Sequence, residues 1–248
     1  MELDFLLLAL VGIFAGFMNT LAGGGSLPTL PALMLFGLPA DFANGTNRVA
    51  VLAQALASVT FFDREGKFDR RGLGPLLVPA LLGASVGAAS ASQIPASYLK
   101  PILLLVMTTI ALTMLFAPKL IAPEPTDEAP RAPDKKSFIT FFAIGLYGGF
   151  AQAGVGIFLL AGLGGLLRYD LVHANGMKSA IAAAFTALSL LIFLAAGQVE
   201  WLPGLALAAG MVLGARVAVF LAIKSGNVLL HRIVLVLVLI SCGAAWLN

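Results

Sequence analysis

The stretch that decides the fold is residues 5–40, FLLLALVGIFAGFMNTLAGGGSLPTLPALMLFGLPA, which contains no charged side chain. As one straight helix this run would be about 54 Å long at 1.5 Å per residue. The hydrocarbon core of a bilayer is only about 30 Å thick. We therefore expect the run to turn at Gly23-Gly24-Gly25-Ser26. A second uncharged run, residues 137–167, is interrupted in the same way at Gly154-Val155-Gly156.

The composition of the whole chain is that of a membrane protein. Of its 248 residues, 60% are hydrophobic and 11% are charged, and the mean hydropathy is +0.99. Soluble domains carry roughly 25% charged residues, so a soluble fold is excluded. The net charge of +3 does not indicate nucleic acid, because membrane proteins collect basic residues in their cytoplasmic loops. The single cysteine, Cys242, allows no intrachain disulfide.

Apolar segments of helical length are distributed evenly over the chain, five on each side of a central polar stretch. They lie at 5–22, 26–38, 43–62, 73–92 and 99–117, and then at 138–153, 156–167, 177–196, 203–223 and 228–247. The divider, 118–137, holds four prolines among mixed charges and is expected to be a solvated loop. The sequence thus predicts an all-α polytopic membrane protein with a first transmembrane repeat (1–117), a cytoplasmic linker (118–137) and a second repeat (138–248).

The two halves share short motifs at a constant separation, which indicates an internal duplication. Ala43–Asn47 (ANGTN) matches Ala174–Lys178 (ANGMK), and Gly66–Asp69 (GKFD) matches Gly197–Glu200 (GQVE). In both pairs the leading glycines, 45 and 176 or 66 and 197, lie 131 positions apart. We therefore expect each half to be a copy of one unit, with a Gly-broken hairpin at its start.

Lysine and arginine mark the loops that face the cytoplasm. They are concentrated in the loops around 63–72 and 118–137, while the loops around 37–47, 92–98 and 197–202 have none in the loop proper. With five segments in each half, this distribution places both termini outside. It also predicts that the second half is inverted relative to the first.

Matching glycine breaks in two repeats are the best sequence indicator of a transporter's substrate site. A helix that starts after such a break presents free N–H groups and the positive end of its dipole, which favours an anion. Basic residues inside apolar segments agree with this, since Arg48, Lys178 and Arg216 fall there while every acidic residue lies in a loop or tail. Alternatively, Arg48 and Lys178 snorkel to the membrane interface.

The candidate substrate-binding residues come from the two breaks and from the segments that follow them. They are Asn19, Gly23, Gly24, Gly25, Ser26, Thr46, Asn47, Arg48, Gln152, Gly154, Gly156, Lys178 and Arg216. The glycines could instead serve helix packing alone, and Asn19 and Gln152 could form interhelical hydrogen bonds. His173 and His231 lack metal-ligand spacing, and no HExxH, GxSxG or phosphate-loop motif occurs, so neither a metal, a cofactor nor a catalytic residue is expected.

The run from Gly16 to Ser26, followed by Gly45-Thr46-Asn47-Arg48, resembles the first-repeat signature of the TauE/SafE family, and its YfcA-like branch in particular. The stretch 145–150 together with 197–201 resembles the second-repeat signature. The resemblance implies a bacterial inner-membrane permease for sulfite or an organosulfonate. The chain departs from the pattern at Ser26, where a fourth glycine is common, and at Met177, where threonine is common.

The sequence accordingly predicts a transporter that works by alternating access, with a small anion as its partner and a homo-oligomer as a compatible assembly. Export is the favoured direction, because an inside-negative potential drives a monovalent anion outward by roughly 2.3 kcal/mol per 100 mV. The alternative function is a membrane scaffold that anchors a sulfur-metabolising enzyme through the loops 63–72 or 118–137.

Overall fold

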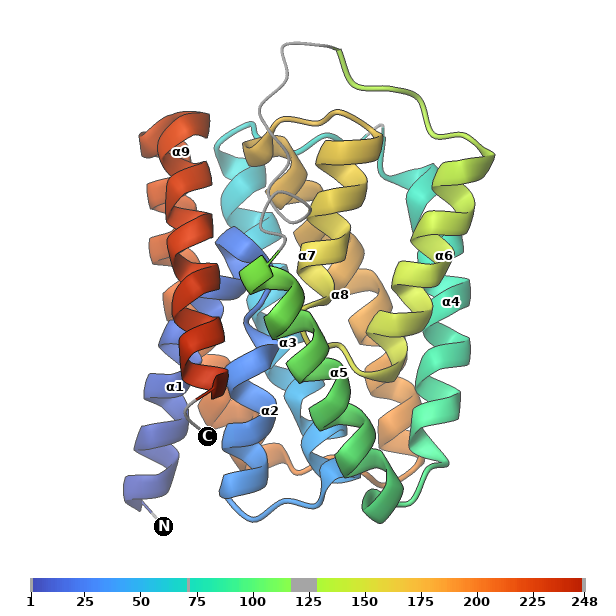
Figure 1. Cartoon of the computed structure of the whole chain (residues 1–248), viewed down its shortest axis with the longest axis vertical. Helices are drawn as coiled ribbons and strands as arrows, with labels where there is room; N and C mark the ends of the chain where they lie inside the picture. The colour runs from blue at the N-terminus through green and yellow to red at the C-terminus, as the bar shows by residue number, and fades with distance from the viewer. Residues whose placement is uncertain (1, 71, 117–128, 247–248) are drawn as a thin grey trace.

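The computed structural model describes residues 2–70, 72–116 and 129–246. Within these ranges all regular structure is helical, and the helices run roughly along the long axis of the molecule (Figure 1). The predicted linker falls largely on residues 117–128, outside the described part, as do the side chains of His231 and Cys242. The prediction of an all-α polytopic membrane protein is confirmed.

The first half contributes five helices whose bounds follow the predicted segments. They are α1 (Glu2–Ala22), α2 (Ser26–Leu35), α3 (Ala40–Arg64), α4 (Gly74–Ser92) and α5 (Ala96–Phe116). The second half contributes α6 (Lys135–Phe150), α7 (Val155–Leu160) with a π-helical turn η2 (Ala161–Leu166), α8 (Leu171–Ala195) and α9 (Trp201–Trp246). The two last predicted segments are both helical and together make up α9. This helical stretch turns back at the upper end of the molecule in Figure 1, so both of its ends lie toward the lower end.

Four helices are long and apolar enough to cross a bilayer on their own. They are Leu3–Ala22, Gly74–Ser92, Leu171–Ala195 and Trp201–Lys224. Large apolar side chains on the outside of the bundle, such as Leu10 on α1, Val86 on α4 and Leu213 on α9, are more than half exposed. An apolar outer surface of this kind suits contact with lipid rather than water.

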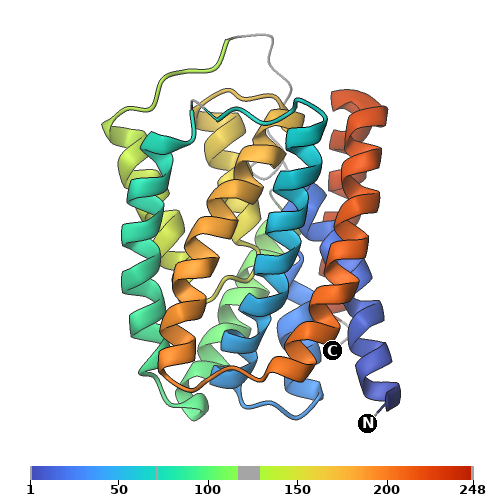
Figure 2. The same cartoon turned by 180° about the vertical axis from the view of Figure 1, so that it is seen from behind.

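Helices α3 and α8 lie side by side in the middle of the bundle (Figure 2), and α9 also packs against α3. Both central helices begin earlier than predicted. Pro39 precedes α3, and the Asp170 side chain caps α8 by accepting hydrogen bonds from the backbone N–H groups of Val172 and His173. As a result Asn44 and Asn175 lie inside helices, not in turns.

Close helix crossings depend on glycine. A Cβ atom at Gly16 of α1 would lie 2.1 Å from the carbonyl oxygen of Met211 in α9, and one at Gly214 of α9 would lie 2.0 Å from that of Ile13. Helices α4 and α6 cross in the same way, since a Cβ at Gly83 would lie 2.1 Å from the carbonyl oxygen of Phe142. The first helix of each half therefore packs against the fourth segment of the other half, through small residues.

The repeated Asn-Gly motif has a packing role at each end of the bundle. The turn after α3 has Gly66 at φ +66° and sets the carbonyl oxygen of Lys67 2.8 Å from where a Cβ of Gly176 would lie. The turn after α8 has Gly197 at φ +69° and places the carbonyl oxygen of Gln198 2.0 Å from where a Cβ of Gly45 would lie. Each turn thus docks against the motif glycine of the opposite half.

Candidate functional site

Both predicted helix breaks are present, and they touch each other inside the bundle. In the first break α1 stops at Ala22, Gly23 adopts φ +79°, and α2 starts at Ser26. In the second, Gly154 adopts φ +66° before α7. A Cβ at Gly23 would lie 2.2 Å from the carbonyl carbon of Gly156, so only glycine allows this contact.

The short helices that leave the breaks point in opposite directions. Helix α2 runs through the lower half of the molecule and α7 through the upper half (Figure 1). Their N-terminal ends consequently meet at mid-height, where each helix has backbone N–H groups without an intrahelical acceptor. This arrangement concentrates the positive ends of two helix dipoles in one place.

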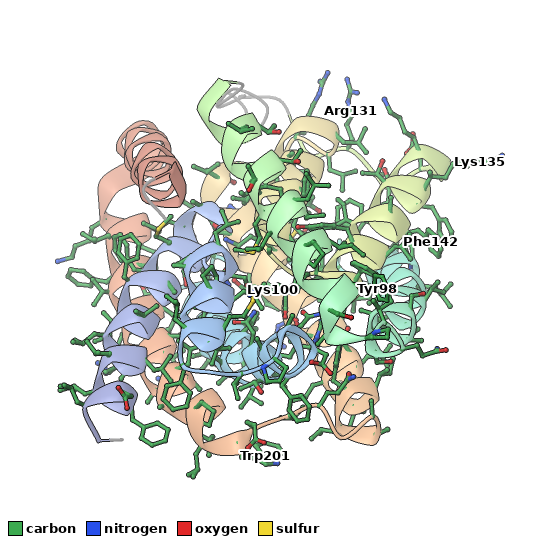
Figure 3. The ribbon with its side chains drawn as sticks, turned by 60° about the horizontal axis from the view of Figure 1, so that its bottom comes forward. Tyr98, Lys100, Arg131, Lys135, Phe142 and Trp201 are labelled. Atoms are coloured by element: carbon green, nitrogen blue, oxygen red, sulfur yellow. The ribbon has the colours of Figure 1, made fainter. Side chains whose placement is uncertain are left out.

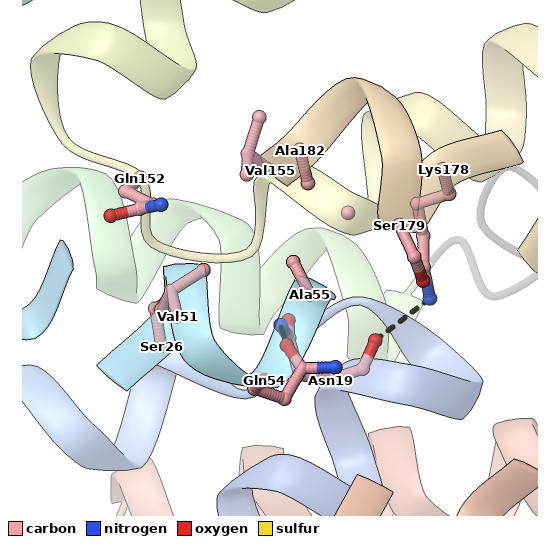
Figure 4. A pocket seen from close by; sticks show the side chains of 11 residues that line it. Asn19, Ser26, Val51, Gln54, Ala55, Gln152, Val155, Lys178, Ser179 and Ala182 are labelled. Atoms are coloured by element: carbon pink, nitrogen blue, oxygen red, sulfur yellow. Dashed lines mark hydrogen bonds between the residues drawn. The ribbon is translucent and has the colours of Figure 1, made fainter. Parts of the chain in front are cut away.

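A small buried cavity lies between the breaks and the central helices (Figure 4). Its lining consists of Asn19, Ser26, Val51, Gln54, Ala55, Gln152, Val155, Gly156, Lys178, Ser179 and Ala182. We call it the central cavity. Its volume of about 10 Å³ is roughly what a single water molecule requires.

Two residues from opposite breaks line the central cavity and have backbone amides without a hydrogen-bond partner among the described residues. They are Ser26, the first residue of α2, and Gly156, the second residue of α7. The side chain of Gln152 also borders the cavity, is 1% exposed, and leaves its Oε1 atom unpaired while Nε2 donates to Thr186 at 2.7 Å. The cavity therefore offers polar groups that a ligand could bind.

Lys178 brings a positive charge to the central cavity, and its ammonium group already has three acceptors. Nζ donates to the backbone carbonyls of Asn19 and Thr20 and to the Asn175 side chain, each at 2.7 Å. Figure 4 shows the bond to Asn19. Asn19 and Thr20 belong to the last turn of α1; the Asn19 carbonyl also accepts from the backbone N–H of Gly23 at 3.0 Å, whereas Thr20 lies beyond the last such bond. Lys178 of α8 thus holds the C-terminal end of α1, where a cation is favoured.

Arg48 does the same for the other broken helix. From α3 it donates to the carbonyls of Gly148 at 3.2 Å and Gly149 at 2.5 Å, in the last turn of α6, and its guanidinium lies 4.5 Å from the centre of the Phe193 ring. The Asn44 side chain accepts from Arg48 at 3.4 Å and donates to Phe150 at 2.8 Å. We call Arg48 and Lys178 the two helix clamps.

Both clamps are buried, with 0% of Arg48 and 3% of Lys178 exposed, so the alternative that they snorkel to the interface is wrong. The reason is the early start of α3 and α8, which places both residues about two turns inside their helices. The two clamps differ, however, in their position relative to the central cavity. Lys178 borders the central cavity, whereas Arg48 does not.

Other predicted residues are buried but make structural hydrogen bonds. Thr46 accepts from the backbone N–H of Glu200 at 2.9 Å, and Asn47 accepts from Thr29 at 2.7 Å while its Nδ2 atom stays unpaired. Gly25 donates its N–H to the Asn19 side chain at 3.3 Å, next to the positive-φ residue Gly23. Gly24 lies between them in the first break.

Arg216 stands apart from this group. It lies on α9, its side chain is exposed, and it does not border the central cavity. Its position in the middle of an apolar segment suggested burial, but the Gly210 and Gly214 face of α9 turns toward α1 and leaves Arg216 on the outside.

Several polar residues at the site were not among the predicted ones. Gln54 accepts from the Asn19 side chain at 2.6 Å and donates to Thr20 and Ser58 at 2.8 Å each. The signal in the sequence was the spacing of Gln54 and Ser58, four residues apart on one face of an otherwise apolar segment. Among the residues that the structure describes, no group of three or more His, Cys, Asp or Glu side chains comes together.

An apolar helical bundle with two broken helices that meet at a buried polar cavity is the architecture of a membrane transporter. The comparison with known families agrees. The family model "Sulfite exporter TauE/SafE" matches residues 8–245, so the chain belongs to the TauE/SafE family.

Named relatives carry transporter descriptions. A "Probable membrane transporter protein" of Haemophilus influenzae is 29% identical over 92% of this chain and 88% of its own length. YfcA of Escherichia coli K12, also a "Probable membrane transporter protein", is 26% identical over 91% of this chain and 83% of its own. YtnM of Bacillus subtilis, with the same description, is 27% identical over 87% of this chain and 75% of its own.

Proposed function

We propose that this protein exports a small sulfur-containing anion, sulfite or an organosulfonate, across the bacterial inner membrane by alternating access. The observation that carries the proposal is the convergence of three positive elements on one buried cavity. These elements are the free amides of Ser26 and Gly156 and the ammonium group of Lys178. A buried cavity of this kind attracts a negative solute and repels a cation.

The contracted size of the central cavity supports alternating access. A space of about 10 Å³ cannot hold a four-atom anion, so the site has to widen during transport. Hairpins that leave the site in opposite directions suit this task, because the half that contains α2 and the half that contains α7 can open separately (Figure 1). Two inverted repeats, 1–117 and 138–248, are therefore part of the proposal.

The distribution of residues at the two ends supports the proposed orientation. Figure 3 shows Arg131 and Lys135 at one end of the molecule and Trp201 at the other. Basic residues mark the cytoplasmic end, and a half-exposed Trp201 suits the opposite membrane interface. Both chain ends would then face the periplasm. Export agrees with the membrane potential, which favours outward movement of a monovalent anion.

The proposal is tested by measuring sulfite and sulfoacetate efflux from proteoliposomes. Gln152→Asn shortens the cavity-lining amide by one methylene and keeps a residue type that tolerates the positive φ of +59°. The matched control is Gln93→Asn, at an exposed position after α4. We expect at least tenfold slower efflux for Gln152→Asn and an unchanged rate for Gln93→Asn.

An imposed inside-negative potential should accelerate efflux from wild-type proteoliposomes. Absence of flux for every sulfur-containing anion would refute the proposal. Equal rates for Gln152→Asn and wild type would show that the anion passes elsewhere.

A further inference from the structure

The two helix clamps do the same structural work but differ in their access to the substrate. Arg48 is fully buried, its two terminal nitrogens donate to carbonyls of α6 and to Asn44 while Nε has no partner, and the residue does not line the central cavity. Lys178 holds α1 in the same manner but borders the central cavity with its side chain. An anion in the cavity can therefore reach one clamp and not the other.

We propose that Lys178 is the residue that couples substrate binding to movement. The incoming anion accepts hydrogen bonds from the Lys178 ammonium group in place of α1, and so releases the C-terminal end of α1. Arg48, by contrast, is a positioning residue that holds α6 whether or not substrate is present. The inference rests on the proposed function, because it requires that an anion enters the central cavity.

Hydrogen-bond counting explains why the anion and α1 compete. The ammonium group of Lys178 has three N–H donors, and all three already point to acceptors at 2.7 Å. A charged oxygen also attracts the ammonium group through the Coulomb interaction of two opposite full charges, which a neutral carbonyl lacks. An anion that gains one of these donors therefore removes it from Asn19, Thr20 or Asn175.

A relay through Asn19 carries the change to the first break. The backbone carbonyl of Asn19 accepts from Lys178, its Oδ1 accepts from the N–H of Gly25 at 3.3 Å, and its Nδ2 donates to Gln54 at 2.6 Å. A shift of Lys178 thus acts on the residue that ties α1 to the start of α2 and to α3. Movement of the first hairpin follows from occupancy of the cavity.

The second break also borders the cavity, through Gln152, Val155 and Gly156, but its clamp, Arg48, does not. Its polar lining residue, Gln152, donates to Thr186 of α8 and not to a clamp. The Tyr147 hydroxyl donates to the carbonyl of Ala153 within the break itself. The carbonyls at the end of α6 and in the second break are thus held by Arg48 and Tyr147, neither of which borders the cavity. The two halves of the molecule are therefore functionally unequal.

The test compares sulfite-induced thermal stabilisation of purified full-length wild type, Lys178→Met and Arg48→Met. Both substitutions remove a clamp and its charge, and so each is the control for the other. We expect Arg48→Met to melt at a lower temperature but to keep its sulfite response. Lys178→Met should bind sulfite at least tenfold more weakly. Lys178→Arg and Arg48→Lys provide the same comparison if a methionine variant does not fold.

Hydrogen exchange gives a second readout that a purely structural role would not affect. Sulfite should raise exchange in wild type at residues 19–25 and leave residues 148–151, next to the Arg48 clamp, unchanged, and Arg48→Lys should keep this difference. Equal responses at both breaks, or a sulfite response lost in Arg48→Met but kept in Lys178→Met, would overturn the inference. A wild type that neither transports nor binds sulfite or any organosulfonate would refute the proposed function itself, and is thereby distinguished from failure of the coupling.

Discussion

Arg48 and Lys178 show how a cation can be accommodated inside an apolar bundle without a carboxylate. Each uses backbone carbonyls at the C-terminal end of a broken helix, and each also uses the asparagine of the repeated Asn-Gly motif. Those carbonyls would otherwise be buried without donors, which costs roughly 1–3 kcal/mol for each group. The breaks and the buried cations are thus mutually dependent features of the fold.

Gly23 provides a test of the contact between the two breaks at the scale of a single residue. Gly23→Ala would place a side chain on a residue at φ +79° and within 2.2 Å of Gly156, so the backbone has to move. Gly37→Ala is the matched control, because Gly37 also has a positive φ, +103°, but no atom lies within 4 Å of where its Cβ would lie. We expect Gly37→Ala to cost about 1–2 kcal/mol and Gly23→Ala to cost clearly more.

Thermal unfolding of both variants in detergent measures this difference. A melting temperature of Gly23→Ala equal to that of Gly37→Ala would show that the breaks do not meet as described.

At the residue scale the sequence predicted which positions are unusual but not what they contact. Arg48 and Lys178 were identifiable because a charge inside an apolar segment is costly. Their partners lie about 100 and 159 positions away and are backbone carbonyls, which carry no side-chain signal. Arg216 satisfied the same criterion yet is exposed, because the sequence alone does not show which face of α9 meets α1.

At the scale of elements, the segments and breaks were predictable for two reasons. Bilayer thickness sets the length of a spanning helix, and the uncharged runs exceed that length. The glycines within these runs then indicate where each run turns. The starts of α3 and α8 were not, since Asn-Gly usually indicates a turn and here it lies within helices. Tertiary contact explains the difference. The motif glycine makes room for the carbonyl of an opposing turn, as Gly45 does for Gln198.

The crossing of α1 with α9 depends on small residues at the contact, and neighbouring positions on α9 can test this. Gly214→Val would place atoms 2.0 Å or closer to the carbonyl oxygen of Ile13, and we expect a loss of roughly 1–3 kcal/mol from overpacking. Leu213→Val alters the adjacent residue, which is 58% exposed, and should change stability by less than about 0.5 kcal/mol. Urea or thermal unfolding in detergent compares the two; similar losses would argue against a close α1–α9 contact.

The start of α6 carries a pH-dependent cap. The Asp134 carboxylate accepts a hydrogen bond from the backbone N–H of Ser137 at 2.8 Å and from its hydroxyl at 2.7 Å, and these bonds hold the pKa of Asp134 below its ordinary value of 3.8. The lowered pKa means that the cap stabilises the fold fully above pH 3.8 and is lost as the pH falls through the native pKa.

Asp134→Ala should therefore melt below wild type at neutral pH, and the gap should narrow as the pH drops below 3.8. Melting curves across this range in detergent measure the gap. Asp134→Asn keeps a capping side chain without a titrating group, so its melting temperature should not show the same pH dependence. A gap between Asp134→Ala and wild type that is constant with pH would contradict the role of the carboxylate.

At the scale of the whole molecule, the start of α1 and the end of α9 lie toward one end, and the basic residues Arg131 and Lys135 lie at the other (Figures 1 and 3). If that basic end faces the cytoplasm, the bundle has a defined direction in the membrane. The orientation decides which break opens to which compartment. The proposed direction of transport, and the side to which the hairpin held by Lys178 opens, both depend on it.

Cysteine labelling tests this orientation directly. In a Cys242→Ala background, Gln93→Cys places a thiol at the exposed junction between α4 and α5, and Arg131→Cys places one at the opposite, basic end. A membrane-impermeant maleimide should label Gln93→Cys in intact cells and Arg131→Cys only after permeabilisation. The reverse pattern would place the basic end outside, against the usual retention of Arg and Lys in the cytoplasm. In that case α7, which runs toward the basic end, would lead to the periplasm, and the hairpin that Lys178 releases would open to the cytoplasm.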